Sequence, residues 1–356
     1  MQVSNLTILS GAALTNNNVL TIYASSPDIT FLNQGTLTNN GWIWVNYDNT
    51  ILSTSSNIGL KNEGVINNNA SGTIFIADAT LGFWNVSGTV VCKGDIFIGS
   101  ASDKGLWNAS GTFDVQGSSA HLDVSGNTTC IYNEASFSNE TGGLVDVASA
   151  TLCGIHHVSG TFTNSGTIRI GSSNSTGTYG LKNSATFNNN TGGLINIGRA
   201  ASFSLWNEGT FNNSANITMG YPGGAYPTGI SNSGIFNNNA GGNIDIDRAT
   251  LRGIINATGA TFTNTAIIRI SNPNLIFGPM NNGIENEAAF NNNGAIYIDD
   301  ASLYGVWNKT GTFTNAATLH INADPDSENG TNGVRNTATF NNNAGAQINI
   351  NRVTES

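Results

Sequence analysis

Residues 160–170 read Gly-Thr-Phe-Thr-Asn-Ser-Gly-Thr-Ile-Arg-Ile, and variants of this stretch recur along the whole chain. After a variable stretch, Gly-Leu-x-Asn or a similar motif comes just before the next variant. Fourteen apolar anchors equivalent to Phe162 lie between residues 14 and 340, so thirteen steps of 23 to 29 residues average about 25. A fixed period of this length indicates a solenoid, a propeller or an array. The anchors are Leu14, Leu37, Ile66, Val90, Phe113, Phe137, Phe162, Phe187, Phe211, Phe236, Phe262, Phe290, Phe313 and Phe340.

The alternation of residue types within one repeat predicts short strands. Phe162 and Asn164 fall on one face of an extended chain, while Thr161 and Thr163 fall on the other. Two more such strands follow, separated by Gly/Asn/Ser corners, and three strands make one turn of a three-sided parallel β-helix. A propeller needs about 40–50 residues per blade and antiparallel hairpins, and regular two-residue Asn-Gly turns are not seen. We predict an all-β, right-handed three-sided parallel β-helix (β-solenoid) of about 14 coils, with ~25 residues per coil. The handedness follows from the large cross-section that such a coil implies.

An asparagine closes each Gly-Leu-x-Asn motif. An amide at the same corner of every coil can donate a hydrogen bond to one neighbouring coil and accept one from the other. Such a column forms a ladder of the kind that stacked strands favour. We therefore assign these residues a structural role; one coil has His157 instead. The predicted asparagine ladder consists of Asn33, Asn62, Asn85, Asn108, Asn133, Asn183, Asn207, Asn232, Asn256, Asn286, Asn308 and Asn336.

From Phe137 onward the coils alternate in pairs. Coils with a long first corner, Phe-Asn-Asn-Asn-x-Gly-Gly, begin at Phe187 and Phe236, and shorter ones begin at Phe162 and Phe262. The shorter coils carry insertions, which places variable loops along one edge, where solenoids commonly locate binding. We predict a single β-solenoid domain over residues 1–356, a segment of or subunit in a larger assembly. The insertions are residues 171–180, 220–229, 271–283 and 322–333.

The composition narrows the function classes. Charged residues make up 10% of the chain and the net charge is −10, which argues against nucleic-acid binding because no basic patch is present to neutralise phosphates. The chain contains 56 asparagines and 43 glycines, yet its apolar residues recur in register, so a core is expected rather than disorder. No stretch approaches the ~18 apolar residues of a membrane span. The N-terminus lacks the features of a signal peptide.

The cysteines leave two interpretations open. Cys130 and Cys153 precede ladder positions by three and four residues in consecutive coils, so they are expected near each other. A disulfide is one interpretation, and we favour the other, small buried apolar side chains for these two and for Cys92. No CxxC or His-rich spacing indicates a metal. We predict no metal and no cofactor.

Catalysis by a β-helix would need clustered carboxylates or a basic residue in a groove. Asp123 and Asp146 occupy the same outward column on neighbouring coils, where two carboxylates can bind a cation or perturb each other's pKa. We favour solvated charges that discourage aggregation. No nucleophile–base arrangement emerges, and we predict that the chain is not an enzyme.

Aromatic residues form two outward groups. Trp44, Phe75 and Phe97 occupy one outward position in three successive coils, with Trp42 beside Trp44, and such an apolar strip can stack sugar rings or dock a partner. Cover by a neighbouring domain or subunit is an equally weighted interpretation. A second stripe lies just before the ladder asparagines, and we favour its packing under the inserted loops over a ligand platform. Its aromatic members are Trp84, Tyr132, Trp206 and Trp307.

Outward Thr-x-Thr pairs occur at residues 36/38, 161/163, 261/263 and 312/314. A flat threonine array on a β-solenoid is similar to the surface of ice-binding proteins. Asparagine interrupts the array in intervening coils. A glycan- or ice-binding role predicts that substitution of Trp44 or Thr163 abolishes binding without loss of folding.

The Gly-Thr-Phe-x-Asn…Gly-x-Ile-x-Ile cassette resembles the Asn/Gly/Thr-rich repeats of large secreted bacterial parallel β-helix proteins, including Bacteroidota-type surface adhesins and fibre proteins. The resemblance covers essentially the whole chain and is one of repeat style. It implies a secreted, extracellular or cell-surface protein, a non-catalytic structural or adhesive part of an appendage or fibre. The expected partners are copies of itself in a homo-oligomer or filament, neighbouring domains of a longer chain, or surface glycans. Glycan or ice binding is the alternative function, and a polysaccharide-degrading enzyme is less favoured.

Overall fold

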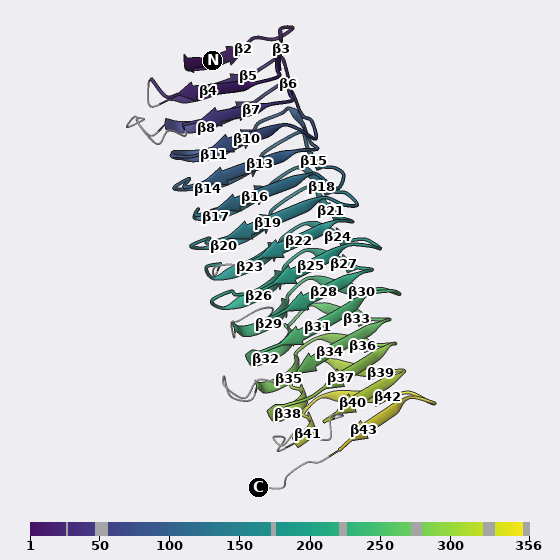
Figure 1. Cartoon of the computed structure of the whole chain (residues 1–356). Helices are drawn as coiled ribbons and strands as arrows, with labels where there is room; N and C mark the ends of the chain where they lie inside the picture. Colours follow the sequence, from purple (N-terminus) through teal and green to yellow (C-terminus); the bar gives the residue numbers. More distant parts are fainter. Residues whose placement is uncertain are drawn as a thin grey trace. The chain divides into compact units, whose positions relative to one another are not determined.

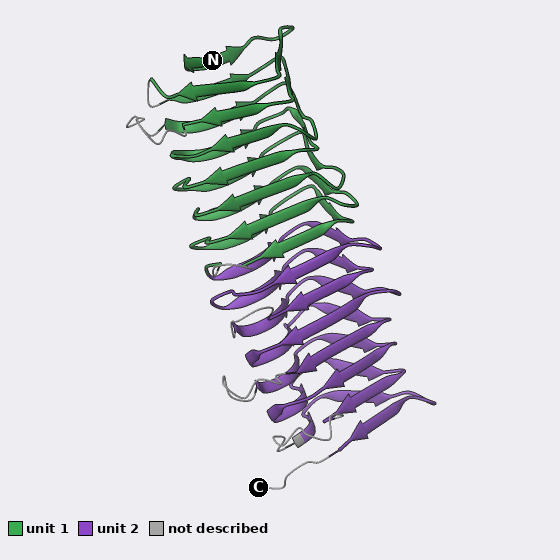
Figure 2. Cartoon of the chain, in the orientation of Figure 1, with its two compact units in different colours: residues 1–177 green, residues 178–356 purple. Residues whose placement is uncertain are grey.

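The computed structural model is built from β-strands, with no helix among the residues it describes. Contacts divide the chain into two compact units, Met1–Gly177 and Thr178–Ser356 (Figure 2). In each unit, described here by itself, three parallel sheets are formed by every third strand along the chain (Figure 1). We name them sheets A, B and C. The described residues are 1–25, 28–46, 56–171, 176–220, 226–271, 280–322 and 332–351.

In unit 1 each coil contributes one strand to each sheet. Sheet A contains β1 (Gln2–Ser4), β4 (Val19–Tyr23), β7 (Trp42–Val45), β10 (Thr73–Ile76), β13 (Asp95–Gly99), β16 (His121–Ser125), β19 (Leu144–Ala148) and β22 (Thr167–Ile170). Sheet B contains β2 (Leu6–Ile8), β5 (Ile29–Asn33), β8 (Ser56–Asn62), β11 (Ala79–Asn85), β14 (Lys104–Asn108), β17 (Thr129–Asn133) and β20 (Cys153–His157). Sheet C contains β3 (Ala13–Asn16), β6 (Thr36–Asn39), β9 (Val65–Asn68), β12 (Thr89–Cys92), β15 (Thr112–Val115), β18 (Ser136–Asn139) and β21 (Thr161–Asn164).

Unit 2 repeats this arrangement. Sheet A contains β25 (Leu194–Ile197), β28 (Asn216–Met219), β31 (Asn243–Asp247), β34 (Ile267–Ser271), β37 (Ala295–Ile298), β40 (Thr318–Ile321) and β43 (Gln347–Ile350). Sheet B contains β23 (Tyr179–Asn183), β26 (Phe203–Asn207), β29 (Tyr226–Asn232), β32 (Ala249–Asn256), β35 (Met280–Asn286), β38 (Ala301–Asn308) and β41 (Asn332–Asn336). Sheet C contains β24 (Thr186–Asn189), β27 (Thr210–Asn213), β30 (Ile235–Asn238), β33 (Thr261–Asn264), β36 (Ala289–Asn292), β39 (Thr312–Asn315) and β42 (Thr339–Asn342). The predicted three-sided parallel solenoid is confirmed, with one strand of sheet C for each of the fourteen anchors.

The core follows the alternation of the sequence. The anchor side chains line sheet C inside each unit, and the phenylalanines stack on one another at 4.4–5.3 Å between ring centroids. Phe162 is fully buried, while Thr161 on the other face is exposed. The paired isoleucines of sheet A, such as Ile168 and Ile170, are also fully buried. Each inward column therefore brings like side chains into contact along the stack.

The predicted asparagine ladder is confirmed in both units. It closes sheet B, and each amide nitrogen donates to the amide oxygen of the next asparagine at 2.7–2.9 Å. In unit 1 the ladder ends on His157, whose Nδ1 lies 2.9 Å from the amide nitrogen of Asn133. The amides also donate to backbone carbonyls of neighbouring corners, as Asn85 does to Gly88 at 3.1 Å. These bonds satisfy polar groups that burial would otherwise leave costly.

A second asparagine ladder closes sheet C. Asn39 donates to Asn68 at 2.8 Å in unit 1, and in unit 2 the ladder links six successive pairs from Asn189 to Asn342 at 2.8 Å. The sequence pattern places these asparagines inward but does not by itself reveal their pairing. In two coils of unit 1 the equivalent positions are Cys92 and Val115, which interrupts the ladder.

The glycine of Gly-Leu-x-Asn is required by a close approach between sheets. In unit 2, a Cβ at Gly253 would lie 2.4 Å from Cγ2 of Ile270 and 2.7 Å from the carbonyl oxygen of Gly283. Gly229 and Gly283 meet the equivalent isoleucines, and in unit 1 Gly82 meets Ile98. The wall of the core between sheets A and B therefore has room for no side chain at this position.

The alternation of coils is visible in the corner lengths of unit 2. Between sheets C and A the long corners run from β24 to β25 and from β30 to β31, and the short ones from β27 to β28 and from β33 to β34. The corner from β36 to β37 is also short, so the strict alternation fails at Phe290. The predicted insertions join sheet A to sheet B, and most of their residues lie outside the described part of the chain.

Candidate binding surfaces

The outer face of sheet A in unit 1 carries an aromatic strip, which we define as Trp42, Trp44, Phe75 and Phe97. Phe75 is in register with Trp44 on one side and with Phe97 on the other. Its ring centroid lies 4.3 Å from that of Trp44 and 4.7 Å from that of Phe97, with interplanar angles of 8° and 16°. Trp42 lies 5.8 Å from both Trp44 and Phe75. Register brings Trp44, Phe75 and Phe97 together, because strands of successive coils lie one strand spacing apart, and Trp42 lies beside them on the same face of β7, two residues before Trp44.

Mutual stacking decides how much of the aromatic strip faces solvent. Trp42 is 45% exposed, and Val19 beside it on β4 is 44% exposed. Trp44, Phe75 and Phe97 are half-buried, because each covers part of its neighbour. The strip therefore presents a ridge of ring edges and partial faces, which is apolar surface of the kind that marks an interaction site.

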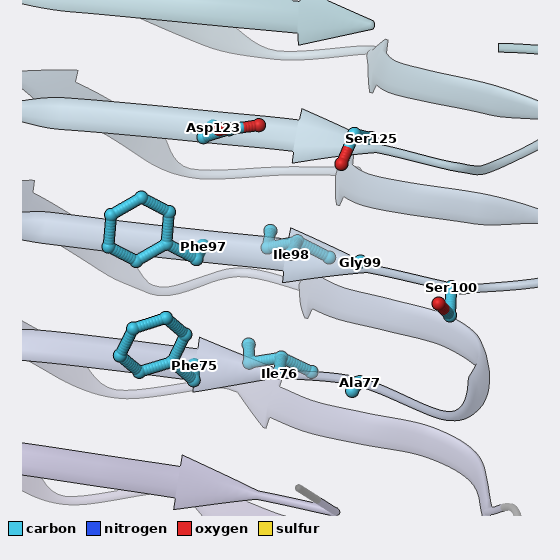
Figure 3. Close-up of a pocket in the computed structure, with 9 residues that line it drawn as sticks. All are labelled: Phe75, Ile76, Ala77, Phe97, Ile98, Gly99, Ser100, Asp123 and Ser125. Carbon is cyan, nitrogen blue, oxygen red and sulfur yellow. The ribbon is translucent and has the colours of Figure 1, made fainter. Parts of the chain in front are cut away.

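A pocket of about 200 Å³ lies beside the ridge (Figure 3). Phe75 and Phe97 form one wall, and the small residues Ala77 and Gly99 leave the floor low. A Cβ at Gly99 would meet no atom within 4 Å, so the missing side chain opens this space. The polar residues that line the pocket are Ser100, Asp123 and Ser125.

In the two coils after Phe97, the outward position that holds an aromatic ring in the strip is occupied by a carboxylate. Asp123 is in register with Phe97 on one side and, as predicted from the sequence, with Asp146 on the other. Arg169 follows Asp146, and its Nη1 lies 3.8 Å from an oxygen of that carboxylate. Burial, and then the negative charge of Asp146, raise the pKa of the Asp123 carboxyl above its ordinary value. The pocket thus has an apolar wall and an acidic end.

The second stripe lies on the outer face of sheet B. In unit 1 Trp84 stacks on Trp107 at 5.0 Å and 9°, and Tyr132 meets Trp107 edge to face at 6.3 Å. Trp107 is a member that we missed, although it precedes Asn108 as the others precede their asparagines. Lys61 lies over Trp84 at 5.1 Å, and Lys104 lies over Trp107 at 5.2 Å. In this unit the rings of Trp84, Trp107 and Tyr132 therefore lie on three consecutive coils.

Cations also cover the rings of this stripe in unit 2. Lys182 lies 5.3 Å from the ring centroid of Trp206. Trp307 is contacted by Lys309 at 4.9 Å and by Arg335 at 5.1 Å. Cation–aromatic contacts of this kind stabilise by about 0.5–2 kcal/mol each. The predicted cover by inserted loops falls largely on residues 172–175, 221–225, 272–279 and 323–331, outside the described chain.

A buried carboxylate on sheet B of unit 2 was not identified from sequence. The side chain of Glu285 is 2% exposed and contacts Arg252 Nε at 2.5 Å and Lys309 Nζ at 2.9 Å. Burial by itself raises the pKa of this carboxyl, but the hydrogen bonds from Lys309 and Arg252 outweigh it and hold the pKa below its ordinary value. Lys309 also binds Glu287 at 2.7 Å. Both carboxylates of this cluster form ion pairs with its two cations, which favours a structural role for Glu285.

The outer face of sheet C carries the threonine pairs. In unit 2 the two outward positions of each strand hold no charged residue, and where asparagine occupies the second position in three successive coils, β24, β27 and β30, the side chains bond to one another. Asn212 donates to Asn188, and Asn237 to Asn212, both at 2.9 Å. These three asparagines therefore extend the regular array with side chains held by hydrogen bonds.

Cys92, Cys130 and Cys153 are buried, and none of them forms a disulfide. The disulfide interpretation for Cys130 and Cys153 is therefore wrong, and the interpretation as small buried side chains holds. Cys153 is in register with Thr129 rather than with Cys130, which separates the two sulfurs. Burial is the main cause that raises the pKa of Cys130 to about 11 and that of Cys92 to about 12.

The remaining titratable groups are dispersed. In the described residues, no group of three or more His, Cys, Asp or Glu side chains is arranged to hold a metal ion. None of the described residues belongs to a helix long and apolar enough to cross a membrane.

Comparison of the chain with family models, with curated proteins and with solved structures gives no match.

Proposed function

We propose that this chain is a structural and adhesive β-solenoid of an extracellular surface appendage or fibre and that it performs no catalysis. The observation that carries the proposal is the repetition of side-chain ladders in coil after coil. Phenylalanine, aliphatic residues and asparagine occupy most inward positions, so most of the sequence serves the stack. A stack of this kind is a scaffold, and specificity then lies on its outward faces.

The secreted location is part of the same proposal. It rests on the resemblance of the repeat to secreted bacterial β-helix proteins. The acidic, sparsely charged surface supports solubility outside the cell without attraction to nucleic acids.

Electron microscopy of the purified full chain, together with sedimentation velocity, tests the fibre proposal. We expect copies that associate end to end or side by side as concentration rises. Dispersed monomers at all concentrations, combined with affinity for a soluble ligand, would overturn the fibre role. Attachment to cells or surfaces with and without the purified chain measures the adhesive role separately.

Glycan binding is the second candidate, and the aromatic strip beside a pocket with polar groups favours it. Sugar rings have apolar C–H faces and a rim of hydroxyls, so they pair with aromatic walls and hydrogen-bonding groups. Ice binding is supported by the neutral Thr/Asn face of sheet C in unit 2. A thermal-hysteresis measurement on the chain and on the Thr263→Ala variant separates ice binding from glycan binding, since the two use different faces.

A further inference from the structure

We propose that the pocket beside the aromatic strip binds one unit of a neutral hexopyranose glycan, with Phe75 and Phe97 as its wall and Asp123 and Ser125 as its hydrogen-bonding end. This inference deepens the glycan-binding candidate and rests on it. The fibre proposal does not depend on it.

The size and shape of the pocket fit one sugar ring of a longer chain. Pockets that enclose a drug-sized ligand measure about 300–1,000 Å³, and this one measures about 200 Å³. Its floor at Ala77 and Gly99 is low because neither residue has a side chain longer than a methyl group. The neighbouring rings of Trp44 and Trp42 extend the apolar surface from Phe75, so further sugar units have a surface to lie against.

The polar end offers free hydrogen-bonding groups. In Figure 3 the carboxylate of Asp123 lies along its strand toward Ser125, and the hydroxyl of Ser125 points toward the strand that carries Gly99. Within the described chain, neither the Asp123 carboxylate nor the Ser125 hydroxyl has a hydrogen-bond partner. A half-buried carboxylate without a donor is an acceptor site for sugar hydroxyls, and bonds to a charged group are the stronger ones.

The charges around the pocket select against acidic glycans. Asp95, Asp123 and Asp146 all lie on the outer face of sheet A near the pocket, and Arg169 contacts only the last of them. His121 packs edge to face on Phe97 at 5.5 Å. The chain carries a net charge of −10, so a uronate or sulfated chain would be repelled within the ~8 Å screening length.

Substitutions at the floor and at the wall of the pocket test the proposal. Gly99→Leu fills the pocket from its floor, where space is available and the backbone conformation suits any residue. Phe97→Ala removes the wall. Tyr297→Ala is the matched control, because Tyr297 is an outward ring of sheet A in unit 2 that stacks on His320 in the same way, at 5.3 Å and 12°.

Binding of cellohexaose, xylohexaose and mannohexaose is measured by calorimetry and by tryptophan fluorescence, with hexagalacturonate as the acidic probe. We expect at least one neutral probe to bind with a dissociation constant at or below about 1 mM. Phe97→Ala and Gly99→Leu should each weaken it by at least about tenfold, while Tyr297→Ala leaves it unchanged. Asp123→Asn should weaken it by about threefold or more, because the charge of the acceptor is lost.

Each contrary result overturns a stated part of the proposal. Absence of binding by all neutral probes, with thermal unfolding unchanged, rejects the site. Tighter binding of hexagalacturonate rejects the neutral class of ligand. Equal affinity in Phe97→Ala, Gly99→Leu and the wild type rejects the location. If no probe binds, and Phe97→Ala or Gly99→Leu changes the size of the species seen by sedimentation velocity, the aromatic strip is a contact between copies of this chain instead of a glycan site.

Discussion

Single inward residues of this chain stabilise the adjacent coils through hydrogen bonds between equivalent positions. Asn207 accepts a hydrogen bond from Asn183 at 2.8 Å and donates to Asn232 at 2.8 Å. It also donates to the backbone carbonyls of Gly209 and Ile235, at 3.1 and 2.9 Å. A buried amide with four partners is a fully satisfied polar group, and loss of one member leaves its partners unpaired.

Asn207→Ala should therefore lower the free energy of unfolding by about 3 kcal/mol. Denaturant unfolding followed by circular dichroism measures the change. The matched control is Asn196→Ala, an outward asparagine of sheet A, for which we expect less than about 0.5 kcal/mol. Equal effects for the two variants would contradict the structural role of the ladder.

The cysteines give a second prediction at this scale. Burial raises the pKa of Cys92 from 9.0 to about 12 and that of Cys130 from 9.0 to about 11. Because the thiolate is the reactive form, a thiol reagent at pH 8 should modify none of the three cysteines in the folded chain and all three after unfolding. Rapid modification of the folded chain would contradict their burial.

The same shifts set a dependence of stability on pH. The folded chain keeps these protons above pH 9, where the unfolded chain releases them. The stability they contribute is complete below pH 9 and is lost as pH rises toward about 11 and 12, by about 1.4 kcal/mol per pH unit and thiol. Unfolding measured from pH 8 to 11 should show a smaller decline in Cys92→Ala than in the wild type, and parallel curves would argue against the shift.

At the scale of the strand, the wall between sheets A and B limits what the sequence can contain. The Gly column lies within the sheet B strands, where the ends of the sheet A isoleucines press against the backbone. Gly253 and Gly283 face Ile270 and Ile298 in this way, with Cβ distances of 2.4 Å in both cases. A methyl group there must displace either backbone or a buried side chain.

Gly253→Ala should thus destabilise unit 2 by about 2–3 kcal/mol, despite the small size of the change. Gly99→Ala provides the control, because its Cβ meets nothing within 4 Å, and it should change stability by less than about 0.5 kcal/mol. Thermal unfolding of both variants tests the prediction. A neutral Gly253→Ala would mean that the wall relaxes around the added methyl group.

At the scale of the whole molecule, charge governs association. The chain has a net charge of −10 at pH 7 and an isoelectric point of about 4.6. Self-repulsion of this size keeps copies apart, and it fades as the carboxylates gain protons or as salt screens them. A chain that forms fibres is therefore expected to assemble at lower pH or at higher salt concentration.

Light scattering should accordingly show larger particles as pH falls from 7 to 5, or as salt rises at pH 7. Electron microscopy would then distinguish ordered filaments from amorphous aggregates. Particle size that stays constant over both ranges would count against self-assembly as the function. Circular dichroism at each pH keeps unfolding apart from association.

Most of the architecture was predictable, because inward and outward positions alternate locally and the same register recurs about every 25 residues. Phe162, Asn183 and Asp123 therefore lie where their positions in the repeat place them. Trp107 was available to the same reasoning and was missed. The second asparagine ladder was obscured by Cys92 and Val115, which break its pattern in two successive coils.

The coil, its inward columns and the ladder that closes sheet B follow from the sequence, since each depends on spacing within one repeat. The other contacts between side chains of successive coils are seen only in the folded chain. The tertiary structure places Lys309 on Glu285, closes Gly253 against Ile270, and opens a pocket between Phe97 and Ser125. The physical reason is that these contacts depend on side-chain length and conformation between stacked strands, and on insertions that change the distance along the chain without changing the register in space.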